Sequence, residues 1–206
     1  MKKISKVASM MFFASAIILT ITACQKETVL KNEAEELQMS SAKNGPVTRA
    51  YRDSFVNHLM FVPDIAGGWT APNISPAWYP GDGRGHAAHV ANANIYFNQY
   101  GNGPGVVAAP VTMFFAGVLA AAGYTGIPAS VSTIIFDDKG NSIWFHHTSI
   151  LSTPVSPTRI NVLGEQDIVG GTGKFSEATG HVILNAFFNP QNLQESSSWQ
   201  TGWISY

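Results

Sequence analysis

The chain has 206 residues, of which 45% are hydrophobic and only 12% are charged, about half of the usual charged fraction. This composition can build a hydrophobic core and excludes an intrinsically disordered chain. Beyond residue 50 there are five Lys or Arg and nine Asp or Glu, without a basic cluster, which excludes a nucleic-acid-binding surface.

Residues 1–23 have the pattern of a secretory signal peptide. A positive segment with Lys2, Lys3 and Lys6 comes first, and residues 7–22 are mainly apolar. The apolar run is shorter than the roughly 20 residues that a membrane-spanning helix needs. We therefore predict a cleaved leader.

The leader ends at Ile21-Thr22-Ala23-Cys24, and Cys24 is the only cysteine of the chain. This segment resembles the bacterial lipobox, in which an aliphatic residue and two small residues precede the cysteine that receives a diacylglyceryl group. The resemblance implies a lipid-anchored protein of the cell envelope, expected at the outer membrane, on its periplasmic face or at the cell surface. An ordinary signal peptide followed by a chance cysteine is the alternative.

Residues 24–49 are expected to form the lipid anchor and a flexible linker. They are polar and charged and contain no aromatic residue, as is typical of a solvated tether. A tether of about 26 residues has an average reach of roughly 28 Å. We place the folded domain at residues 50–206, and it has no second cysteine with which to form a disulfide.

Several segments of this domain have the alternation of β-strands. Residues 91–100 put small and apolar side chains on one face and mainly Asn and Tyr on the other. Residues 131–136 and 142–147 are rich in β-formers and flank a strong turn signal, which predicts a hairpin. Further strands are expected at residues 159–163, 181–188 and 201–206.

One segment has helical periodicity instead. Apolar side chains recur with helical spacing from Val111 to Ala122, Pro110 suits the first helical position, and Gly123 suits the C-terminal cap. A helix of this length covers roughly 20 Å, too short for a bilayer core of about 30 Å. We expect a buried or inserted helix over Pro110–Ala122, with insertion into a membrane as the alternative.

The most distinctive segment is residues 170–180, Gly-Gly-Thr-Gly-Lys-Phe-Ser-Glu-Ala-Thr-Gly. Its glycines suit a turn, and its pattern does not match a phosphate-binding loop because Phe175 stands where Ser or Thr is required. The segment resembles the glycine-rich turn of the allene oxide cyclase and dirigent proteins and of bacterial secreted proteins with the same calycin-like barrel. Residues 201–206 and, more loosely, residues 85–90 are similar to the closing and opening segments of those bacterial proteins.

The resemblance implies an all-β fold, an antiparallel β-barrel of about eight strands, to which the sequence adds one helix. The interior of a barrel of this size is either filled by side chains or holds one small ligand. As residues lining such a cavity we name five aromatic residues of the expected strands: Tyr96, Phe97, Trp144, Phe145 and Phe187.

The sequence contains weaker candidates for chemistry. Glu165 and Asp167 are two residues apart and could act as acid or base if their strand face is interior. His86 and His89 could contribute to a zinc site, although a structural role is the expectation for each histidine. We expect neither a metal nor a cofactor, and no motif for a nucleophilic enzyme is present.

Three functions are consistent with these features. The first is binding of a small, mainly apolar ligand in the barrel without catalysis, and the second is a cyclase or isomerase acting in the cavity. The third is a surface interaction or adhesion module with a filled barrel and an exposed apolar patch. The expected partners are the membrane, through the lipid at Cys24, and the small apolar ligand, while the oligomeric state stays open.

Overall fold

The computed structural model describes residues 45–64, 76–90, 92–102 and 105–206. The expected leader, Cys24 and most of the linker lie outside the described residues. Val47–Tyr206 forms one compact unit, and its first strand begins at Thr48, just before the predicted domain boundary at residue 50.

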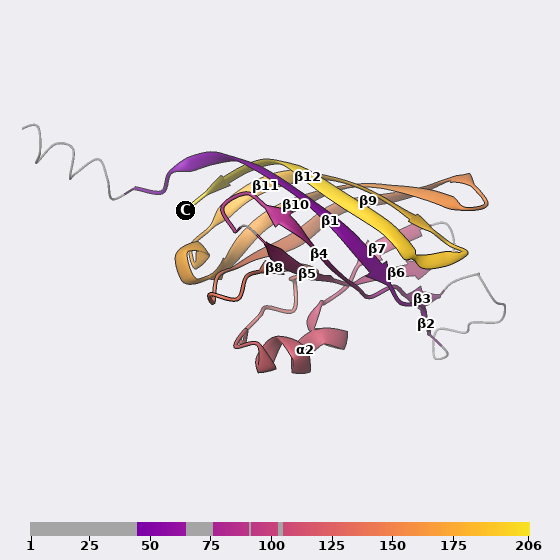
Figure 1. The fold of residues 1–206 in the computed structure, drawn as a ribbon, viewed down its shortest axis with the longest axis horizontal. Helices are drawn as coiled ribbons and strands as arrows, with labels where there is room; N and C mark the ends of the chain where they lie inside the picture. Colours follow the sequence, from indigo (N-terminus) through magenta and orange to yellow (C-terminus); the bar gives the residue numbers. More distant parts are fainter. Residues whose placement is uncertain (1–44, 65–75, 91, 103–104) are drawn as a thin grey trace, which may run out of the picture. The chain divides into compact units, whose positions relative to one another are not determined.

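The central feature is a closed antiparallel β-barrel of eight strands, in the order β1-β12-β11-β10-β9-β8-β5-β4, with β4 pairing back onto β1 (Figure 1). The predicted barrel is thereby confirmed. The strands are β1 Thr48–Leu59, β4 Gly81–Ala87, β5 Ala93–Phe97, β8 Thr133–Phe136, β9 Ser142–Ser156, β10 Arg159–Thr172, β11 Thr179–Asn189 and β12 Asn192–Ser205.

Four further short strands form a separate small sheet in the order β2-β3-β6-β7. They are β2 Val62–Pro63, β3 Ala77–Trp78, β6 Gln99–Asn102 and β7 Gly105–Ala108. The single strand predicted at residues 91–100 is therefore two strands, β5 and β6. They belong to different sheets and are separated at Asn98, whose side chain bonds to the carbonyl of Pro110.

Two barrel strands, β1 and β4, were not expected from the sequence. In β1 every second side chain from Tyr51 to Leu59 is buried, but two of these interior residues are polar, Asp53 and Asn57, which hides the apolar alternation. Strand β4 has glycine at three alternate positions because it lies very close to β1. A Cβ at Gly85 would stand 1.9 Å from the carbonyl oxygen of Ser54.

The glycine-rich segment 170–180 joins β10 to β11. Gly170 has a φ of 134°, which L-residues rarely adopt, and it lies at a register shift between β9 and β10. Residues Gly173–Phe175 form a one-turn 3-10 helix that directs Phe175 into the barrel core, where it is fully buried. The segment is thus a turn, as predicted, but its first residues still belong to β10.

The helix α2, Thr112–Ala121, lies against the outside of the barrel wall and does not plug the barrel. Adjacent residues of β8 show this: Ile134 packs with Phe115 and Leu119 of the helix, whereas Ile135 packs in the barrel interior. Tyr96 stacks on Phe115 with ring centroids 4.5 Å apart. Within the described part of the chain, no helix has the length and apolarity to cross a membrane.

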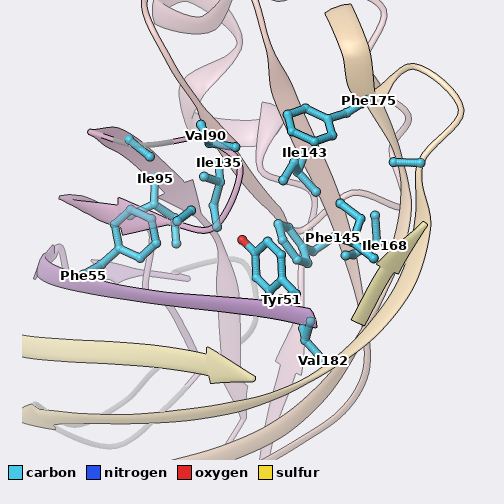
Figure 2. Close-up of a cluster of buried hydrophobic side chains, with 14 residues drawn as sticks. Tyr51, Phe55, Val90, Ile95, Ile135, Ile143, Phe145, Ile168, Phe175 and Val182 are labelled. Atoms are coloured by element: carbon cyan, nitrogen blue, oxygen red, sulfur yellow. The ribbon is translucent and has the colours of Figure 1, made fainter. Parts of the chain in front are cut away.

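The barrel interior is filled at one end. Figure 2 shows the side chains of Tyr51, Phe145 and Phe175 pointing inward from different parts of the wall, packed among aliphatic residues such as Ile143 and Ile168. All five are at most 3% exposed. This core fixes the closed end of the barrel and leaves the other end for the pocket described next.

Candidate functional site

A pocket lies inside the barrel, toward the end where β1 finishes and β12 begins. About 50 Å³ of it can hold the centre of a water molecule, so the pocket is narrow. This is well below the roughly 300–1,000 Å³ of common small-molecule pockets. The apolar part of its lining comes from eight residues: Leu59, Ile95, Phe97, Val162, Leu184, Ala186, Phe187 and Phe188.

The polar part of the lining is dominated by carboxamides. Asn57, Asn98, Gln166 and Gln200 all border the pocket, and each side chain is at most 2% exposed. Strand alternation brings Asn57, Gln166 and Gln200 to the interior face of β1, β10 and β12 respectively. The pocket is therefore mainly apolar, with several hydrogen-bonding groups on its wall.

A hydrogen-bond chain holds His147 in this wall. The Gln166 amide nitrogen lies 2.9 Å from His147 Nε2, His147 Nδ1 lies 2.8 Å from Ser132 Oγ, and Ser132 Oγ donates to the carbonyl oxygen of Phe145 at 3.3 Å. The chain is consistent when Nδ1 carries the proton and Nε2 accepts one from Gln166. Burial, followed by the neighbouring His146, lowers the pKa of His147 to about 4, so the imidazole is neutral at pH 7.

Four carboxamide oxygens in this wall have no hydrogen-bond partner among the described residues. They are Asn57 Oδ1, Asn98 Oδ1, Gln166 Oε1 and Gln200 Oε1. A buried acceptor without a donor costs about 1–3 kcal/mol. Such groups in native proteins point to a ligand, an ordered water or a functional constraint.

Asp53 places a carboxyl group in the barrel interior, opposite Gln200 in the β1–β12 register. The Tyr51 hydroxyl donates to Asp53 Oδ2 at 3.0 Å. Burial raises the pKa of Asp53 to about 7, although the hydrogen bonds from Tyr51 and from the backbone of Gln200 oppose the shift. No sequence pattern paired Asp53 with a second catalytic group. Only its position between Tyr51 and Phe55 on one strand face could have shown that its carboxyl group is interior.

The five predicted lining residues fall into three groups. Phe97 and Phe187 border the pocket, although Phe187 lies on the outward register of β11 with the Arg159 guanidinium 4.1 Å above its ring. Phe145 belongs to the filled core, with its ring 5.9 Å from that of Tyr51. The remaining two, Tyr96 and Trp144, pack against the helix outside the wall.

Glu165 and Asp167 project from the outer face of β10, on either side of the interior Gln166. Each has about half of its side chain exposed, and both flank His181: Asp167 Oδ1 is 2.8 Å from Nδ1 and Glu165 Oε2 is 3.9 Å from Nε2. The enzyme hypothesis required one of them inside the barrel, and neither is there. The interior carboxyl group is that of Asp53.

The two histidines named as weak metal candidates lie near each other in the chain but do not converge. His86 is exposed on β4 opposite Ser54, whereas His89, in the turn after β4, has Nε2 3.2 Å from the carbonyl oxygen of Ala50. No group of three or more His, Cys, Asp or Glu side chains in the described ranges is arranged to hold a metal ion.

The fold and the pocket define a closed eight-stranded antiparallel barrel with one filled end and one narrow, mainly apolar pocket lined by carboxamides. Comparison of the chain with family models, with curated proteins and with solved structures finds no match.

Proposed function

We propose that this protein is a lipid-anchored protein of the cell envelope whose barrel binds a small, mainly apolar ligand without catalysis. The observation that carries the proposal is the interior pocket between Leu59, Phe97 and Leu184. An apolar lining with a few polar groups is the usual composition of a small-molecule site. The similarity of residues 170–180 to the allene oxide cyclase and dirigent turn also favours a barrel with a cavity.

The anchor in this proposal is the lipid on Cys24. Because two or more acyl chains make membrane binding stable, the barrel would remain at the membrane. A barrel held there is suited to taking up an apolar molecule that the membrane contains.

Binding is favoured over catalysis by the chemistry of the pocket wall. Both ring nitrogens of His147 are engaged in hydrogen bonds, and a pKa of about 4 makes it a weak base at neutral pH. Asp53 has a pKa near neutrality, but it lies beyond the pocket lining, where the Tyr51 hydroxyl occupies one of its oxygens. A cyclase or isomerase would need Asp53 or an equivalent acid in contact with the substrate.

Native mass spectrometry tests the proposal. Residues 45–206 contain the barrel, both core clusters and the pocket but not Cys24, so this fragment is purified without detergent. We expect an additional small mass that is lost on denaturation. Ala186→Phe, which fills the pocket from β11, should abolish it, and Ile183→Phe on the outward face of the same strand should not. An apo mass for wild type after exposure to envelope lipid extract would contradict the proposal.

A second candidate function, an interaction module, is favoured by one observation on the outer wall. Six large apolar side chains are exposed there, and the cross-strand register makes them neighbours across five adjacent strands. This outer apolar patch consists of Val56, Leu151, Leu163, Ile183, Trp199 and Trp203.

The occupant that fits the outer apolar patch is a second copy of this chain. Arg52 and Glu165 lie at opposite ends of one cross-strand row, through Thr201 and Ile183. If two patches face each other about a two-fold axis parallel to the strands, each Arg52 meets Glu165 of the second copy. The charges then reinforce the apolar contact.

Analytical ultracentrifugation distinguishes this second function. A dimer that is lost in Trp199→Lys and kept in Val107→Lys, an equally exposed apolar position outside the patch, would support it. A monomeric wild type at all concentrations up to roughly 100 µM, which corresponds to a dissociation free energy below about 5.5 kcal/mol, would remove it.

A further inference from the structure

Beyond a generally apolar ligand, the pocket wall presents hydrogen-bond acceptors. The four unpartnered carboxamide oxygens belong to side chains that are at least nine-tenths buried, and all four residues border the same pocket. Another unpartnered buried oxygen of the barrel interior, Asp53 Oδ1, lies outside the pocket lining.

Hydrogen bonds to neighbouring groups orient the side-chain amides of Asn98 and Gln166. Asn98 Nδ2 donates to the carbonyl oxygen of Pro110 at 3.0 Å, and a carbonyl can only accept, so the Asn98 oxygen is the free end. Gln166 donates to His147 Nε2 in the tautomer whose Nδ1 proton goes to Ser132 Oγ. Exchanging oxygen and nitrogen at Asn98 would lose an existing hydrogen bond.

We propose that the pocket selects an apolar molecule that carries a neutral hydroxyl group, and that it rejects the corresponding carboxylate. This inference rests on the proposed binding function and specifies its ligand. A hydroxyl donates to the carboxamide oxygens, whereas a carboxylate would bring a charged oxygen against them. No Lys or Arg is among the residues that line the pocket in the described ranges, so a carboxylate would have no cation there.

The hydroxyl groups of Thr133 and Ser198 do not alter this preference. Each can donate or accept, and Ser198 Oγ already accepts from Asn57 Nδ2 at 2.9 Å. The four oxygens have almost no accessible surface, so contact with a ligand requires rotation of an amide about its soft terminal torsion. The narrow pocket suits a single hydroxyl better than a large polar head.

The test compares three probes of matched size on residues 45–206 by isothermal titration calorimetry: 1-octanol, its isomer heptyl methyl ether, which lacks the donor, and octanoate. A hydrogen bond made to a buried acceptor is worth about 1–1.5 kcal/mol, so 1-octanol should bind roughly tenfold more tightly than the ether and more tightly than octanoate. Gln166→Met and Gln200→Met should each reduce the preference for 1-octanol over the ether. Gln194→Met, exposed on β12, should leave it unchanged.

Each outcome decides one point. Equal affinities for 1-octanol and heptyl methyl ether, or tightest binding of octanoate, would overturn the hydroxyl preference and leave the proposed binding function standing. If none of the three probes binds to wild type, the binding function itself fails, and the inference fails with it. An unchanged preference for 1-octanol in both Met variants would overturn the role of the carboxamides.

Discussion

The substitution Asp53→Asn should stabilise the barrel at neutral and alkaline pH, and the gain should vanish in acid. Burial raises the pKa of Asp53 from 3.8 to about 7 in the folded protein. Between these two values the folded state keeps a proton that the unfolded state has lost, so stability falls as the pH rises and is constant above about pH 7. A difference of roughly three pKa units corresponds to at most about 4 kcal/mol.

Asparagine has nearly the same shape, cannot ionise, and can still accept the hydrogen bond from Tyr51. Urea unfolding of residues 45–206, followed by tryptophan fluorescence, should show similar stabilities of wild type and Asp53→Asn near pH 4. The variant should be more stable by up to about 4 kcal/mol near pH 8. A difference for Asp53→Asn that does not change with pH would contradict the raised pKa of Asp53.

Three further predictions concern His147, the glycines and the anchor. The pKa of His147 is lowered to about 4 in the folded protein, so wild type should lose up to about 3 kcal/mol of stability as the pH falls from about 6.5 to about 4. In the same urea titrations, His147→Gln should not show this loss. Gly85→Ala should lower the free energy of unfolding by at least about 3 kcal/mol, since its Cβ would meet the Ser54 carbonyl. Gly117→Ala, on the open side of α2, should raise the free energy of unfolding by about 0.5–1 kcal/mol. Equal denaturation midpoints for the two variants would contradict the packing around Gly85. Metabolic labelling with palmitate should mark the wild-type chain and not Cys24→Ser, and label on the variant would rule out Cys24 as the lipid site.

Alternation and β-formers predicted most of the strands, whereas their closure into a barrel was implied by the resemblance of residues 170–180 to a known glycine-rich turn. It did not reveal β1 because the interior face of that strand includes Asp53 and Asn57, nor β4 because glycine replaces side chains there. Both features follow from contacts between segments far apart in the chain: β4 approaches the β1 backbone, and the polar residues of β1 face the barrel interior. Local periodicity does not contain that information.

The candidate site was harder to predict than the fold. Alternation separates Tyr96 from Phe97 and Trp144 from Phe145, but it does not say which face of a strand is interior. Here both faces are apolar, because α2 covers the outside of β8 and packs on Tyr96 and Trp144. Only the closed barrel shows that Phe97 and Phe145 point inward. The carboxamides were overlooked because Asn and Gln carry no motif and become informative only when they are buried together.

Ligand binding in the barrel is tested most directly by a crystal structure of residues 45–206 grown in the presence of 1-octanol. We expect density for the alcohol in the pocket between Phe97 and Leu184, with its oxygen within hydrogen-bond distance of Gln166 or Gln200. A pocket that contains only ordered water bonded to those carboxamides, or one closed by the side chains of Phe97 and Phe188, would contradict ligand binding in the barrel.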